Sequence, residues 1–310
     1  MNMEVFVLGT GGMMPLPSRG LTSILLRREG ELLLFDCGEG TQIALRRLNL
    51  RWKKISVIFI SHTHADHVTG IPGMLMLSSQ VDREDPLLLI GPPRLKEYVE
   101  ASRRILDMYI NYEIVVKEVY EEAVVYEGEG YRVRCFPLRH TKPCLGFSLE
   151  EDERPGVFLP DQALALGVPR GPLWSRLQSG QSVELGGGRI VASGEVMGPK
   201  RQGRKFSFLT DTTYVPEAAG FVRGADLLIC EGMFTEELGQ DARDKKHLTA
   251  AQAAQLAREG EVRSLGLIHY SPRYTNGELK KLLVQAREVF PNTFLTRELQ
   301  TIALAYPEAG

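Results

Sequence analysis

The run His62-Thr63-His64-Ala65-Asp66-His67 decides how this sequence folds and what kind of site it carries. It follows directly on residues 55–61, an apolar stretch whose β-branched and aromatic content predicts a buried strand. Neutral imidazoles and carboxylates are ligands that suit Zn²⁺ and similar divalent ions. A lone histidine is more simply a core or surface residue, whereas three in one loop beside an aspartate predict a metal site.

Three further candidate ligands follow strand-like segments in the same way. His140 comes after residues 132–138, Asp211 after residues 206–210 and His269 after residues 264–268. Side chains placed just beyond the ends of neighbouring strands converge at one edge of a sheet, where a rigid scaffold fixes their geometry. The pattern therefore predicts a single metal centre at a sheet edge.

Composition indicates an ordinary globular protein. Of 310 residues, 43% are hydrophobic and 25% charged, and no apolar run approaches the length of a membrane span. Residues 1–9 lack a basic region and a cleavage signal, so we expect no secretory peptide. The four cysteines are scattered without a Cys-x-x-Cys pair, which favours buried apolar residues over disulfides. We expect a cytoplasmic protein with one large domain over residues 1–310 that carries an insertion.

Short apolar segments alternate with helical patterns over most of the chain, which predicts an α/β fold. Helices are expected at residues 41–48, 94–108, 249–259 and 278–289, with Thr249 as the N-cap of the third. Strands are expected at residues 4–8, 23–27, 32–35, 56–61, 87–90, 113–119, 132–138, 206–210, 226–230, 264–268, 293–296 and 301–305.

Residues 153–205 interrupt this alternation. The segment is rich in Gly and Pro and contains eight basic and four acidic residues, so it carries +4 while the rest of the chain carries −6. Gly and Pro alone would indicate a flexible linker. A basic insertion in an otherwise acidic chain instead favours an arm that holds a polyanion.

The histidine loop resembles the signature of the metallo-β-lactamase superfamily, which implies an αββα sandwich with a binuclear site at one edge. Further motifs narrow the resemblance to the ribonuclease Z family of tRNA 3′-processing endonucleases and extend it over nearly the whole chain. These motifs are Leu8-Gly9-Thr10-Gly11, Leu34-Phe35-Asp36-Cys37-Gly38-Glu39-Gly40-Thr41-Gln42, Gly70-Ile71-Pro72-Gly73, Leu209-Thr210-Asp211-Thr212, His247-Leu248-Thr249-Ala250 and His269-Tyr270-Ser271-Pro272-Arg273-Tyr274.

The resemblance implies a role for each site residue. It assigns one metal to His62, His64, His140 and Asp211, and a second to Asp66, His67, His269 and Asp211. Two Zn²⁺ ions are expected, with Mn²⁺ or Co²⁺ as possible substitutes. Asp66 would orient a metal-activated hydroxide that attacks the phosphodiester, and His247 would protonate the 3′-oxygen. Without the resemblance, His247 would be taken as a histidine near a helix start with no special function.

The resemblance also implies a substrate and a partner. The insertion would be the arm that grips precursor tRNA, with Lys200, Arg201 and Arg204 on phosphates and Gly171 and Pro172 shaping its tip. Cleavage would leave a 3′-hydroxyl on the tRNA and a 5′-phosphate on the trailer, and a homodimer is expected. Residues 17–21 only partly match the family's loop near the tRNA 3′ end, which leaves discrimination of CCA-ending precursors open. The alternatives are a small-molecule phosphodiesterase or other hydrolase of this fold, and a non-catalytic RNA-binding protein.

Overall fold

The structure is a computed structural model that describes residues 3–81 and 83–306. These residues form two compact units. The larger, called here the sandwich unit, comprises the chain up to Glu150 together with Arg204–Ala305. The smaller, called here the inserted unit, comprises Glu151–Gly203 and Tyr306.

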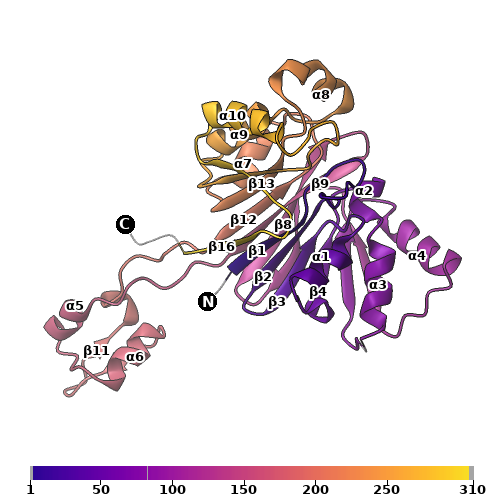
Figure 1. Ribbon diagram of the computed structural model, residues 1–310. Helices are drawn as coiled ribbons and strands as arrows, with labels where there is room; N and C mark the ends of the chain where they lie inside the picture. Colours follow the sequence, from indigo (N-terminus) through magenta and orange to yellow (C-terminus); the bar gives the residue numbers. More distant parts are fainter. Residues whose placement is uncertain (1–2, 82, 307–310) are drawn as a thin grey trace. The chain divides into compact units, whose positions relative to one another are not determined.

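Two seven-stranded sheets form the middle of the sandwich unit (Figure 1). The first sheet has the order β16-β1-β2-β3-β4-β5-β6 and the second the order β15-β14-β13-β12-β9-β8-β7. The strands of the first sheet are β1 Met3–Gly9, β2 Ser23–Arg28, β3 Glu31–Phe35, β4 Ile55–Phe59, β5 Leu87–Gly91, β6 Ile114–Glu118 and β16 Thr301–Leu304. Those of the second are β7 Ala123–Gly128, β8 Tyr131–Arg139, β9 Pro143–Glu151, β12 Lys205–Leu209, β13 Leu227–Glu231, β14 Leu265–Ile268 and β15 Thr293–Leu295.

Apolar side chains from the facing sides of the two sheets make the central core. Phe35 on β3 stacks on Phe59 of β4, with ring centroids 5.0 Å apart, and meets Phe206 of β12 edge to face at 5.4 Å. Aromatic contacts of this kind contribute about 0.5–1.5 kcal/mol beyond the burial of their area. The core therefore joins the two sheets through large, fully buried rings.

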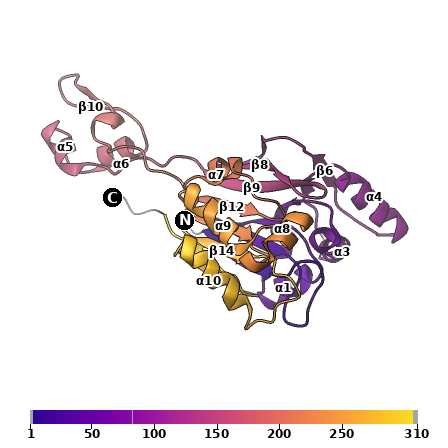
Figure 2. The same ribbon diagram turned by 90° about the horizontal axis from the view of Figure 1, so that it is seen from above.

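Helices cover the outer face of each sheet, as Figures 1 and 2 show. On the first sheet lie the helices α1 Thr41–Arg47, α2 Ala65–Val68, α3 Ile71–Ser79 and α4 Leu95–Ile105, with the 3₁₀ turn η1 Trp52–Lys54. On the second lie α7 Glu217–Val222, α8 Gly239–Lys245, α9 Ala250–Glu259 and α10 Leu279–Val289, with η3 Glu236–Leu238. Their apolar faces complete two further buried clusters. The αββα sandwich expected from the sequence is confirmed. No helix within the described part of the chain is long and apolar enough to cross a bilayer.

Strand direction brings the candidate ligands to one edge. Strands β3, β4 and β5 are mutually parallel, and so are β12, β13 and β14. Their carboxyl ends therefore point the same way within each sheet. The loops that follow β4, β12 and β14 begin at this edge and carry all of the candidate ligands except His140, which follows β8.

The sequence did not predict strands β7 and β9 or most of the short helices. It also treated residues 153–205 as irregular, whereas the inserted unit is ordered around a small apolar core. Pro160 and Pro172 occupy the first positions of helices, where a missing N–H is tolerated, and Gly167 takes a left-handed φ of 84° after the first of these helices. The elements of the inserted unit are α5 Pro160–Ala165, α6 Pro172–Gln178, β10 Val183–Glu184, β11 Ile190–Val191 and η2 Ser193–Glu195.

The boundary of the inserted unit changes its charge. Arg204 and Lys205 belong to the sandwich unit, where the Arg204 side chain is buried and donates a hydrogen bond to the Leu304 carbonyl at 3.1 Å. Residues 151–203 contain six basic and six acidic residues, so this stretch is neutral rather than +4. Net charge therefore does not support the interpretation of the insertion as a basic arm.

Candidate metal centre

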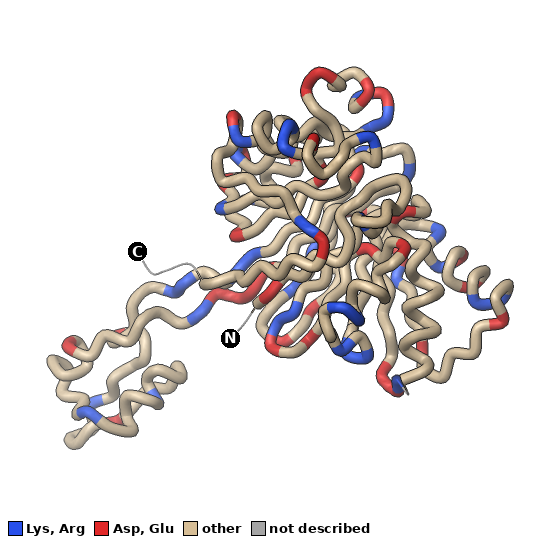
Figure 3. Tube along the Cα trace, in the orientation of Figure 1, with Lys and Arg blue, Asp and Glu red and all other residues tan. Residues whose placement is uncertain are grey.

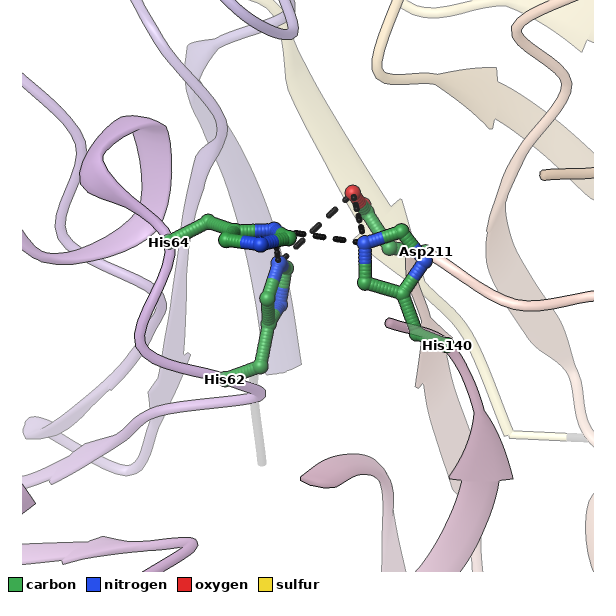
Figure 4. A group of neighbouring side chains, drawn as sticks. All are labelled: His62, His64, His140 and Asp211. Carbon is green, nitrogen blue, oxygen red and sulfur yellow. Dashed lines mark hydrogen bonds and ion pairs between the residues drawn. The ribbon is translucent and has the colours of Figure 1, made fainter. Parts of the chain in front are cut away.

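Four of the expected ligands form a first donor set (Figure 4). His62 Nε2 lies 2.9 Å from His64 Nδ1, which is 3.2 Å from His140 Nε2. The Nε2 atoms of His62 and His140 each lie 3.6 Å from Asp211 Oδ2. Side chains 149 positions apart in the chain thus direct their lone pairs at one point.

A second donor set lies on the other side of Asp211. His67 Nε2 is 3.3 Å from His269 Nε2, and His269 Nε2 is 3.3 Å from Asp66 Oδ2. Asp211 Oδ1 lies 3.4 Å from His67 Nε2 and 3.3 Å from His269 Nε2. Asp211 therefore faces one donor set with Oδ2 and the other with Oδ1.

These donors have the separation that a divalent ion requires. Tetrahedral ligands at about 2.0–2.1 Å from a metal lie roughly 3.3 Å from one another. The donor separations in both sets run from 2.9 to 3.6 Å. Asp211 Oδ1 is buried and accepts no hydrogen bond from the described residues, which a bound cation would remedy. The residues present fit divalent metal ions.

Neighbouring groups hold the imidazoles in orientation. Asp36, which follows β3 with a left-handed φ of 55°, accepts a hydrogen bond from His67 Nδ1 at 2.7 Å and another from the Ser61 N–H. His140 Nδ1 donates to the Lys246 carbonyl at 2.9 Å. Each contact places the proton on Nδ1 and leaves the Nε2 lone pair facing inward. Burial is the largest cause that lowers the pKa of His62 well below its usual value, which keeps this ring neutral.

His247 stands beside the donor sets and pairs with a buried carboxylate. Its Nδ1 lies 3.2 Å from Glu231 Oε1 and 3.8 Å from Asp211 Oδ2. Burial opposes protonation of this ring, but the Glu231 carboxylate, with Asp211, raises the pKa of His247 to about 9. Thr249 caps α9 by accepting a hydrogen bond from the Gln252 N–H, so the predicted N-cap is confirmed.

Glu231 and Asp36 were not assigned roles from the sequence. Glu231 ends β13 and is fully buried, and its Oε1 also accepts the Thr212 N–H at 2.8 Å. An acidic residue at the end of an apolar strand was the only available signal, because the pairing with His247 exists only in three dimensions.

The loop after β1 also contacts the site. The Met13 N–H, with a left-handed φ of 67°, donates to Asp66 Oδ2 at 2.6 Å. A Cβ added to Gly12 would lie 2.5 Å from His269 Nε2, so only glycine fits between the loop and this ring. The first loop of the chain thus closes over the second donor set.

The predicted substrate-binding residues are distributed between the two units. In the inserted unit, Gly171 and Pro172 are exposed at the start of α6. Lys200 is exposed and lies 3.3 Å from Glu153, and Arg201 Nε donates to the Pro155 carbonyl. Arg204 is buried in the sandwich unit and presents no guanidinium to solvent.

Two family models match parts of the chain. One, described as "Beta-lactamase superfamily domain", matches residues 176–270. The other, described as "Anti-Pycsar protein Apyc1", matches residues 3–155. Among solved structures, the metallo-β-lactamase fold protein YhfI from Bacillus subtilis is similar with a TM-score of 0.69 over 98% of this chain and 100% of that chain, at 17% identity.

Longer and closer matches come from ribonuclease Z. The protein of that name from Treponema denticola is 63% identical over 308 residues, which are 99% of this chain and 100% of the relative. That from Methanosarcina acetivorans is 41% identical over 98% of this chain and 99% of its own length. The short form of human tRNase Z is similar with a TM-score of 0.72 and 25% identity over 98% of this chain and 99% of that chain. The chain belongs to the ribonuclease Z family of endonucleases, which are hydrolases with the metallo-β-lactamase fold.

Proposed function

We propose that this protein removes the 3′ trailer from precursor tRNA by hydrolysing one phosphodiester, leaving a 3′-hydroxyl on the tRNA and a 5′-phosphate on the trailer. Ribonuclease Z relatives that align over the whole chain support the substrate, as does the similarity to human tRNase Z. The observation that carries the chemistry is the His247–Glu231 pair beside two donor sets that share Asp211.

The two donor sets would each hold one Zn²⁺, with Mn²⁺ or Co²⁺ as substitutes. His62, His64, His140 and Asp211 would bind the first ion, and Asp66, His67, His269 and Asp211 the second. Two divalent ions held by these residues would lower the pKa of bound water and neutralise charge on a phosphodiester. The five imidazoles of the two donor sets favour Zn²⁺ over Mg²⁺, which prefers oxygen ligands.

Asp66 would act on the attacking water and His247 on the leaving 3′-oxygen, on opposite sides of the phosphorus. Asp66 is fixed by the Met13 N–H, and the hydrogen bond from His269 with the neighbouring imidazoles holds the pKa of this carboxyl below its usual range despite burial. An ionised Asp66 can accept a hydrogen bond from the attacking water and orient it. His247, held protonated by Glu231, would donate its proton to the departing 3′-oxygen.

Binding of the tRNA body would involve the inserted unit. The proposal keeps Lys200 and Arg201 as phosphate contacts, and Gly171 and Pro172 at the start of α6, because all four lie in that unit, which has an apolar core of its own. Arg204 is left out because its side chain is buried in the sandwich unit. Recognition would rest on shape and on single phosphate contacts rather than on net charge.

The expected cytoplasmic homodimer is also part of the proposal. The four cysteines are free and buried, as the sequence indicated, which suits a reducing compartment. Exposed apolar side chains gather at the end of α4 and just after it, where Ile105 is 72%, Leu106 56% and Tyr109 82% exposed. Light scattering at several protein concentrations would measure whether the chain dimerises, with Leu106→Asp as the variant expected to weaken a dimer through this patch.

The rival within the same fold is a small-molecule phosphodiesterase, which would keep both donor sets. One experiment separates the two. Precursor tRNAs with and without an encoded CCA end would be incubated with the metal-loaded protein, and the termini mapped, beside a small phosphodiester. We expect cleavage at the 3′ side of the tRNA with the stated termini and far slower hydrolysis of the small diester. Efficient hydrolysis of the small diester without cleavage of either precursor would overturn the proposal.

A further inference from the structure

One stretch of the sandwich unit is strongly basic and has no acidic residue near it in sequence. Arg46, Arg47, Arg51, Lys53 and Lys54 are all exposed, and no Asp or Glu occurs between Gly40 and Ala65. These five residues are called here the basic track. Figure 3 shows the segment of α1 and η1 with Lys and Arg in blue and no Asp or Glu. The track stands out in a chain whose net charge is −2.

The track is also unneutralised in space. None of its five cations forms an ion pair with the residues that the structure describes, 3–81 and 83–306. Other exposed cations are paired: Arg94 with Glu97, Arg132 with Glu150, and Arg223 with Glu261. The half-buried carboxylate of Glu31 accepts hydrogen bonds from Ser56, Tyr126 and Tyr131.

Local helix stability explains only part of the track. Arg46 and Arg47 lie in the last turn of α1, where cations interact favourably with the helix dipole. Arg51, Lys53 and Lys54 lie beyond that helix, in and before η1, and gain nothing from it. Five like charges within nine residues repel one another, and an anionic ligand would relieve this repulsion.

A cavity lies between the loop after β1 and the helix α1, and Arg47 of the track is one of its lining residues. It has a volume of about 350 Å³, and its walls are the loop with Pro15, Pro17 and Arg19 and the helix α1 with Gln42, Ile43 and Arg47. The same loop touches the site through the Met13 N–H, which binds Asp66. Helix α1, which forms one wall of the cavity, is about 10 Å long by its rise per residue. The track begins in the last turn of this helix. Glu39 and Glu298 also line the cavity, and Thr10 donates two hydrogen bonds to Glu298.

Two further features suit a single strand rather than a duplex. Trp52 is partly exposed among the cations, with Arg46 Cζ 5.9 Å from its ring centroid, and Ile43 is 56% exposed on the cavity wall. In addition, Gln42 Oε1 in the cavity wall is buried without a hydrogen-bond partner among the described residues. Cations along a path with an aromatic ring between them are typical of proteins that bind unpaired nucleic acid, because bases stack on the ring.

We propose that the cavity beside α1 and the basic track bind the single-stranded 3′ trailer of the substrate as it leaves the metal centre. This inference rests on the proposed function, because a trailer exists only if the substrate is precursor tRNA. The nucleotides next to the scissile bond occupy the cavity, and the phosphates further along the trailer meet the five cations. Longer trailers then bind more tightly than short ones.

The test compares precursors with trailers of about two and about twelve nucleotides. On the proposed arrangement the short trailer fills only the cavity, whereas the long one also contacts the track. The variant replaces Arg46, Arg51, Lys53 and Lys54 with Gln and keeps Arg47, which lines the cavity. For the long trailer we expect KM to rise at least roughly tenfold, and the salt dependence of binding to become shallower by about 0.7 per lost phosphate contact. The short-trailer precursor and a small phosphodiester should be cleaved as by the unsubstituted protein.

A matched pair of variants controls for general charge. Arg46→Gln with Arg51→Gln removes two exposed arginines of the track that do not line the cavity, and Arg103→Gln with Arg104→Gln removes two from the last turn of α4. Only the first pair should weaken binding of the long trailer. Equal losses on both trailers, equal losses in both pairs, or no loss would overturn the inference. If the unsubstituted protein cleaves neither precursor, the proposed function itself fails, which is a different outcome from cleavage that ignores trailer length.

Discussion

His247 lies outside the two donor sets, although one of its ring nitrogens lies within 4.8 Å of ligand atoms of Asp211 and His269. The ring of His247 is positioned by its contact with Glu231. The backbone N–H of His247 also donates a hydrogen bond to the Ala242 carbonyl. His247→Ala should therefore lower the rate of precursor cleavage by about 10²–10⁴-fold, the usual contribution of a proton donor, while metal content stays unchanged. Single-turnover kinetics and elemental analysis of the same preparation would check both parts. A demetallated or fully active variant would contradict the assigned role.

Glu231 offers a second prediction, about pH. A proton donor works only when protonated, so cleavage should fall as the pH rises through the pKa of His247. The Glu231 carboxylate raises that pKa, to about 9, against the effect of burial. Glu231→Gln keeps a hydrogen-bond acceptor but removes the charge, so the pKa should fall and the alkaline limb of the kcat profile should move to lower pH.

The profile would be measured between about pH 6 and pH 10 with metal in excess, since His247 is expected to titrate within this range. A limb that stays in place would show that Glu231 does not set the protonation of His247. Melting temperature measured in parallel would separate this effect from lost stability, because Glu231 also accepts the Thr212 N–H.

The sequence predicted the residues that the structure brings together because histidine is scarce in this chain. Six histidines left few ways to build a site, and all six lie at it. The supporting contacts could not be predicted in the same way. Asp36 accepts a hydrogen bond from His67, and its backbone takes a left-handed φ directly after a strand. Met13 binds Asp66 through its backbone N–H, a group that every residue except proline carries.

Among the structural elements, the loop between β1 and β2 is the one most closely fitted to the site. Gly12→Ala would place a methyl group 2.5 Å from His269 Nε2 and 2.8 Å from the end of Met233. His269 must then move, which should weaken the second donor set and leave His62, His64 and His140 in place. We expect metal content to fall from the proposed two ions per chain toward one.

Elemental analysis after dialysis would measure that loss. Gly220→Ala is the matched control, because a Cβ there meets no atom within 4 Å and alanine favours the helix α7. The control should keep both ions and full activity. Unchanged metal content in the Gly12→Ala variant would show that the loop moves to make room for the methyl group and that His269 keeps its position.

Strand prediction failed where the usual pattern is absent. β9 begins at a proline, contains Gly146 and is buried along most of its length, so no alternation is visible. β7 has a register shift between Val124 and Tyr126, which breaks the period of two. The helix α9 was predicted well because its N-cap and its apolar spacing agree. Elements were thus predictable where local pattern and tertiary role coincide.

At the scale of the whole molecule, the inserted unit can be removed without touching the sheets. Glu150 pairs with Lys205 across β9 and β12, so the strands meet as in a hairpin where the insertion leaves the sandwich unit. Replacing residues 152–203 with Asn-Gly gives this hairpin a favoured two-residue turn. Hydrolysis of a small phosphodiester should persist, whereas precursor tRNA cleavage should fall by roughly 10²-fold or more as phosphate contacts are lost.

The comparison of these two activities is the measurement, with circular dichroism as a check on folding. A loss of the same size on both substrates would mean that the inserted unit supports the sandwich unit and does not hold tRNA. Keeping Arg204 matters, because its side chain is buried against the carbonyl of Leu304. The sequence could not predict where the inserted unit ends, because its Gly and Pro content falls off gradually. The structure places this end at Gly203, since the buried side chain of Arg204 belongs to the sandwich unit.

The pairing of β1 with β16 joins the two ends of the described chain within one sheet. During synthesis at roughly 5–20 residues per second, about 15–60 s pass between the appearance of the two strands. Through that interval β1 has β2 on one side and an open edge on the other, which could pair with another nascent chain. His269 also emerges late, so the second donor set is incomplete for most of translation. Cleavage activity should therefore appear only after β14 and the loop that carries His269 have been synthesised.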